Sequence, residues 1–129
     1  MIEVDTVKAE FKDIFQTNIK RDGADALWEW MESSDFFTAP ASSRYHLAAE
    51  GGLCQHSINV YKRLCKLLDD EYGESPYSPE TISIVSLLHD LCKANMYKPG
   101  WRNQKTYDPA KVAAAERYQV KHDAAGDFI

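Results

Sequence analysis

The chain has 129 residues, of which 44% are hydrophobic and 27% charged, and this fits one globular domain able to bury a core. Its formal net charge of −5 argues against binding of long nucleic acid, because affinity for a phosphate backbone depends on clustered lysine and arginine. No apolar run approaches the roughly 20 residues of a membrane span, and the three cysteines form no Cys-x-x-Cys pair, so we expect a cytoplasmic protein.

Amphipathic patterns predict two helices in the first part of the chain. Asp5 or Thr6 can cap the first helix, which we expect to end near Gly23, and Asp22 is the candidate cap of the second. The segment SSDFFTAPASS at 33–43 contains a proline and many small residues, so it predicts a loop.

Two longer apolar patterns follow this loop. A Gly51-Gly52 pair precedes a predicted helix from about 53 to 72. Ser78-Pro79-Glu80 is typical of a helix start, with a capping hydroxyl, a proline at the first position and an acid near the positive end of the dipole. The next helix is apolar almost all round from Ile82 to Leu91, so we expect other helices to enclose it.

The last part of the chain has weaker patterns. The stretch 110–116 can be helical and 118–120 can be extended, without the periodicity of the earlier helices. We therefore predict an all-α helical bundle that forms a single domain over residues 1–129, with an irregular C-terminal segment at 98–129.

The apolar helix contains a polar pair, His89 and Asp90, within SLLHDLCK at 86–93. His89 falls on one helix face with three residues at steps of three and four, which are Ile82, Val85 and Cys92. We therefore expect His89 to point inward, with Asp90 about 100° around the axis. A buried carboxylate without a partner costs on the order of several kcal/mol, and a metal ion between the two side chains would compensate for it.

His56 is the candidate for a third ligand. It lies early in the long helix, in line with Val60, Leu64 and Leu67, and we expect it to face inward too. Two imidazoles and one carboxylate from two packed helices suit a catalytic divalent transition metal with open positions, namely Mn, Fe, Co, Ni or Zn, with Mg as a further option.

The same residues allow interpretations without a catalytic metal. A lone helical histidine such as His56 is usually a satisfied core residue, and Asp90 can instead pair with a nearby cation. The candidate cations are Arg44, Arg63 and Lys93. A closed structural zinc site is another alternative, although its ligands would have an unusual spacing along the chain. Its ligands would be Cys54, His56, His89 and Cys92.

Two motifs make the metal interpretation more specific. GGLCQHS at 51–57 and LLHDLCK at 87–93 resemble the paired signature of the HD-domain superfamily of metal-dependent phosphohydrolases, and the likeness extends over about 35–97. It is strongest toward short bacterial and phage-encoded HD proteins and the HD domain of bacterial 3′–5′ exoribonucleases. The resemblance implies an HD-domain-like helical bundle.

The resemblance also implies that His56, His89 and Asp90 are metal ligands. In that superfamily a further aspartate on a later helix completes the site. The carboxylates that follow Asp90 here lie closer than this distal aspartate does, so we expect the chain to lack its C-terminal helices, with Asp123 as a candidate substitute ligand.

The function implied is a metal-dependent phosphohydrolase that acts on a nucleotide or other small phosphorylated substrate through a metal-activated water. Asp90 and Lys93 would act in catalysis, and Lys93 would also bind the substrate phosphoryl group. His46 and Arg44 are candidate contacts to the substrate. His46 could instead bind a second metal ion, and a further alternative is that both are exposed surface residues without a role in the site. The alternative function is a non-catalytic module that binds a nucleotide or a protein partner on an HD scaffold with an incomplete metal site.

Overall fold

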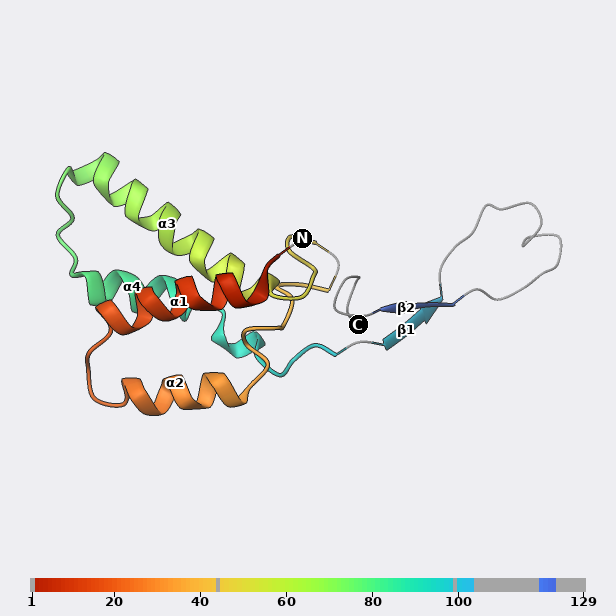
Figure 1. Ribbon diagram of the computed structural model, residues 1–129. Helices are drawn as coiled ribbons and strands as arrows, with labels where there is room; N and C mark the ends of the chain where they lie inside the picture. Colours follow the sequence, from red (N-terminus) through yellow and green to blue (C-terminus); the bar gives the residue numbers. More distant parts are fainter. Residues whose placement is uncertain (1, 44, 99, 104–118, 123–129) are drawn as a thin grey trace.

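The structure is a computed structural model that describes residues 2–43, 45–98, 100–103 and 119–122. Its body consists of four α-helices (Figure 1), which are α1 (Val4–Asn18), α2 (Ala24–Ser33), α3 (Gly52–Tyr72) and α4 (Pro79–Leu87), followed by the single 3₁₀ turn η1 (Leu91–Lys93). The predicted all-α class is confirmed for this body. None of the described helices is long and apolar enough to cross a membrane.

A short antiparallel ribbon follows the helical body. Strand β1 (Gly100–Asn103) pairs with β2 (Gln119–His122), with Gly100 opposite His122 and Asn103 opposite Gln119. Strand β2 overlaps the stretch 118–120 that was predicted to be extended, whereas β1 was not expected, because pairing between distant short segments leaves little signal in either one. The predicted helix at 110–116 lies outside the described residues.

Aromatic side chains form the centre of the hydrophobic core. Phe11 and Phe15 of α1 are buried, and their ring centroids lie 6.3 and 5.3 Å from that of Trp28 in α2. Phe36 and Phe37 come from the loop after α2, and their centroids lie 5.2 and 5.6 Å from that of Phe11. Such pairs contribute about 0.5–1.5 kcal/mol beyond the burial itself. The predicted loop is thus part of the core.

Helix α1 lies between α2 and α3 (Figure 1), and it is in contact with both α3 and α4. Polar bonds join its end to α4: the Asn18 side chain donates to the Ser83 hydroxyl at 3.0 Å. The Glu80 carboxylate accepts the backbone N–H groups of Lys20 and Arg21 at 2.8 and 3.1 Å. These bonds, first of all the one from Lys20, lower the pKa of Glu80 below its usual value.

The predicted ends of the first two helices need correction. The residue before α1 is Glu3, not Asp5, and Gly23, not Asp22, precedes α2 with a φ of 91°. Neither makes a side-chain capping bond. Helix α1 ends at Asn18 instead of near Gly23, because the backbone then turns toward α4, where its N–H groups find a carboxylate.

Candidate metal centre

The glycine pair before α3 is required by the backbone. Gly51 has a φ of 81°, a left-handed conformation that suits glycine. A Cβ added to Gly52 would lie 2.0 Å from the carbonyl oxygen of Leu47, so no other residue fits there without a shift of the backbone. The Leu53 N–H donates to the Ala39 carbonyl at 2.9 Å. The start of α3 is thereby held against the preceding loop, which places the first histidine of the site one turn later.

Helix α4 begins as predicted, because the Ser78 hydroxyl accepts an N–H of the first turn, but it ends at Leu87. His89 and Asp90 lie in the turn between α4 and η1. The predicted helix through Leu91 is therefore wrong, and the two side chains take their directions from a turn.

The predicted inward faces of both helices are only partly found. Ile82 is buried, and Val60 and Leu64 are half-buried. Val85 is 59% exposed and Leu67 is 48% exposed, and His89 and Cys92 are also exposed. The buried side of α4 contains two serines, Ser83 and Ser86, whose hydroxyls each donate to the carbonyl four residues earlier at 2.7 Å. A serine that is satisfied by its own helix can be buried at little cost. Hydrophobic periodicity therefore places only part of the core on the correct side.

His56, His89 and Asp90 nevertheless converge. The Nε2 atoms of the two histidines lie 3.1 Å apart, and each lies 3.3 Å from Oδ2 of Asp90. They form the one group of potential metal ligands of this kind in the described part of the chain. Atoms bound to one tetrahedral ion at about 2.1 Å lie about 3.4 Å apart, so the spacing fits a shared metal ion.

The end of α4 orients the His89 ring. Nδ1 of His89 lies 2.6 Å from the backbone carbonyl oxygen of Ser86, which belongs to the last turn of α4 and has no partner within the helix. Because a carbonyl only accepts, Nδ1 is the protonated nitrogen, and Nε2 faces the cluster with its lone pair. This is the arrangement that metal-binding histidines adopt.

The surroundings of His56 favour the neutral form that binds metals. Burial, followed by repulsion from the His89 ring when that ring is protonated, lowers the pKa of His56 below the usual 6.5, although Asp90 opposes the shift. When Nε2 of His56 carries a proton it can donate to Nε2 of His89, so a proton and a metal ion compete for the centre of the cluster.

Lys93 lies beside the cluster and is already bonded. Its Nζ donates to the carbonyl of Ala41 at 2.9 Å and lies 3.5 Å from Oδ2 of Asp90. Of the two described cations considered for Asp90, Arg63 and Lys93, Lys93 is therefore the one found near it. The backbone N–H of Asp35 donates to the Asn95 side chain at 3.2 Å, and the Asn95 N–H donates back to the Asp35 carboxylate. These bonds tie the turn after η1 to the loop between α2 and α3.

The remaining candidate residues are less closely placed. His46 is exposed, and its ring centroid lies 5.9 Å from that of His56, outside the cluster of three ligands. Arg44 and Asp123 lie outside the described residues, so their predicted roles are not addressed.

The alternative of a structural zinc site with two cysteines does not match the geometry. Cys54 is buried in the core, where burial raises the pKa of its thiol to about 12, and Cys92 is exposed. Neither belongs to the histidine cluster in the described part of the chain.

A groove beside the cluster went unnoticed in the sequence. It has a volume of about 590 Å³, and both His56 and His89 contribute to its lining. The apolar residues spaced at helical steps from His56 to Leu67 on α3 form one wall of this groove, but helical periodicity alone does not distinguish a groove wall from a core face.

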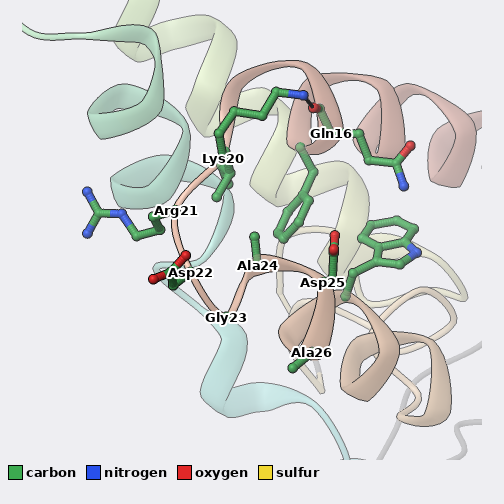
Figure 2. A pocket seen from close by; sticks show the side chains of 11 residues that line it. Gln16, Lys20, Arg21, Asp22, Gly23, Ala24, Asp25 and Ala26 are labelled. Carbon is green, nitrogen blue, oxygen red and sulfur yellow. Dashed lines mark hydrogen bonds between the residues drawn. The ribbon is translucent and has the colours of Figure 1, made fainter.

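A second hollow, of about 610 Å³, lies where α1 connects to α2 (Figure 2) and shares no residue with the cluster. Its cations are already bonded. Lys20 donates to the Gln16 carbonyl, and Arg21 pairs with Glu80 at 3.1 Å. Its lining contains neither histidine nor cysteine. The histidine cluster is therefore a better candidate for a functional site than this hollow.

Comparison with known protein families, curated proteins and solved structures gives no match. The geometry of the cluster and the two motifs that contain its residues are therefore the features that bear on function.

Proposed function

We propose that the protein is an HD-domain metal-dependent phosphohydrolase that acts on a nucleotide or another small phosphorylated substrate. The observation that carries the proposal is the convergence of His56, His89 and Asp90, one from the first motif and two from the second. The Ser86 carbonyl supports it further, because it sets the tautomer of His89 that leaves Nε2 free to bind.

In this proposal His56, His89 and Asp90 hold one divalent transition metal ion. Two imidazole nitrogens and one carboxylate favour Mn, Fe, Co, Ni or Zn over ions that prefer oxygen alone, such as Mg. When bound, such an ion supplies Lewis acidity and lowers the pKa of water toward neutrality.

The role of Lys93 in this proposal is to place a positive charge next to the reacting phosphoryl group. An ammonium group has three donors, and one of them is used by the Ala41 carbonyl. The ammonium also lies 3.5 Å from the Asp90 carboxylate, so one further donor is left for a phosphoryl oxygen, where a fixed cation stabilises the negative charge that develops in the transition state. The bond to Ala41 holds the ammonium in place, so that little ordering of the side chain is needed when substrate binds.

The proposal is tested by metal analysis and by the Asp90→Asn variant. The purified protein should contain a transition metal in stoichiometric amount, and it should hydrolyse members of a panel of nucleotides and aryl phosphates. Asp90→Asn should abolish turnover and metal binding, whereas Asp70→Asn, at an exposed aspartate of α3, should change neither. A protein that binds no metal, and whose melting temperature is the same with and without EDTA, would contradict the proposal.

The second candidate function is a non-catalytic module that binds a nucleotide or protein partner. The observation that favours it is the ligand count, since the described residues bring only three ligands together. Thermal shift measurements with nucleotides in EDTA separate the two functions. Stabilisation by a nucleotide without metal and without turnover supports binding alone.

A further inference from the structure

The groove beside the cluster is polar at one end and apolar along its walls. The polar end is formed by His56 and His89. The walls come from the facing sides of α3 and α4, and they consist of Val60, Leu64, Leu67 and Val85. Exposed apolar side chains are common, but here two exposed residues, Leu67 and Val85, and two half-buried ones surround one concave volume that adjoins the candidate site.

The volume and the bonding pattern indicate the kind of ligand that fits. About 590 Å³ lies within the roughly 300–1,000 Å³ typical of small-molecule sites. The hydroxyl of Ser86, which also lines the groove, is buried and donates to its own helix. Besides His56, the polar side chains of the lining on α3 are Asn59 and Arg63. Hydroxyl groups of a ligand laid against the four apolar side chains would lose water without gaining partners there, whereas an aromatic ring or alkyl chain would lose nothing.

Charge points in the same direction. Arg63 lines the groove, and it does not take part in the ion pairs found among the described residues. A ligand with net negative charge is therefore favoured over a neutral or cationic one.

We propose that this groove binds the non-phosphoryl part of the substrate, and that this part is aromatic or aliphatic, as in an aryl or alkyl phosphate or at the base of a nucleotide, and not a bare phosphosugar. The inference rests on the proposed function for the position of the phosphoryl group. It adds a role for the walls of the groove, which would contact the non-phosphoryl part of the substrate, with Leu67 and Val85 as the residues that determine specificity.

The test compares two phosphonates that are not hydrolysed, so that binding is measured without turnover. Methylphosphonate and phenylphosphonate are titrated by calorimetry into the full chain loaded with Mn²⁺. Phenylphosphonate should bind about tenfold more tightly, which is the gain expected when roughly half of the surface of a phenyl ring leaves water.

Variants at the groove walls separate this subsite from the cluster. Leu67→Gln and Val85→Gln should remove most of the phenyl preference, and they should leave the affinity for methylphosphonate and for Mn²⁺ unchanged. Trp30→Gln is the control, because Trp30 is 46% exposed, much as Leu67 is, but lies on α2 outside the groove. Equal affinity for both phosphonates in the native protein would overturn the inference while leaving the proposed function intact.

A failure of the proposed function gives a different result. If Mn²⁺ does not bind, the groove is tested directly with benzyl alcohol in the metal-free protein, by the methyl resonances of Leu64, Leu67 and Val85. Shifts confined to these methyls support an aromatic subsite, and their absence overturns it. If light scattering shows a dimer that Leu67→Gln converts to a monomer, the groove is a contact between copies and the subsite is excluded.

Discussion

The aromatic core around Phe11 and the face of α3 and α4 that carries the histidines are built in opposite ways. The core is closed by rings from α1, α2 and the loop 33–43, with Phe11 fully buried. On the other face, polar groups are held by backbone carbonyls, while Val85 and Leu67 remain open to solvent. The first region stabilises the fold, and the second keeps the three proposed metal ligands accessible at the cost of exposed apolar surface.

The largest expected effect comes from the core. Phe11→Ala should lower the free energy of unfolding by about 3–5 kcal/mol, because it leaves a cavity among four other aromatic rings. Urea denaturation followed by tryptophan fluorescence measures this change. Trp30→Ala at the surface should cost far less, and equal costs for the two variants would contradict the assignment of the core.

The start of α3 connects the two regions, and Gly52 is its most sensitive position. Gly52→Ala places a Cβ against the Leu47 carbonyl and should cost on the order of 3 kcal/mol or more, with loss of metal binding because His56 is displaced. Gly73→Ala at the end of α3 is the matched control, since its Cβ would meet nothing within 4 Å. Only backbone strain of about 1–2 kcal/mol is expected there. A Gly52→Ala protein with native stability and metal content would contradict this account.

A smaller effect is expected at Lys93. Lys93→Met removes the donor of the Ala41 carbonyl and should reduce the free energy of unfolding by about 1–3 kcal/mol, because that acceptor loses its partner. Turnover should fall further than this stability loss explains. Lys93→Arg retains the charge and should recover part of the activity. If Lys93→Met turns over as the native protein does, the lysine is only structural.

The smallest effect concerns the contact between the end of α1 and α4. Bonds from Lys20 and Arg21 lower the pKa of Glu80, so its contribution to stability is present above the unfolded pKa near 4.3 and is lost as the pH falls through the folded value. The Glu80→Gln variant should therefore have a lower melting temperature than the native protein near pH 7, and the difference in melting temperature should decrease as the pH is lowered. A constant difference across pH would contradict it, and Glu29→Gln on α2 is the control.

Some features of this chain follow from local chemistry and could be predicted. The start of α4 at Ser78-Pro79 depends on a hydroxyl and a proline in adjacent positions, and the long helix after Gly51-Gly52 depends on a left-handed glycine. The three cluster residues were selected from their type and from the likeness of their motifs, although the helical faces assumed for them were only partly found. Which side chains are buried depends on neighbours instead, as Ser83 and Ser86 show.

The amino-acid sequence by itself determined the helical class and the start of α4, because capping and periodicity act within a few residues along the chain. The residues that form the cluster were identified by their types and by the two motifs, not by periodicity. Only the tertiary structure decided that α4 stops at Leu87, that loop aromatics enter the core and that an apolar groove adjoins the histidines. These features arise from contacts between segments far apart in sequence, such as Lys93 with Ala41 and Asp35 with Asn95. Local propensity contains no record of such contacts.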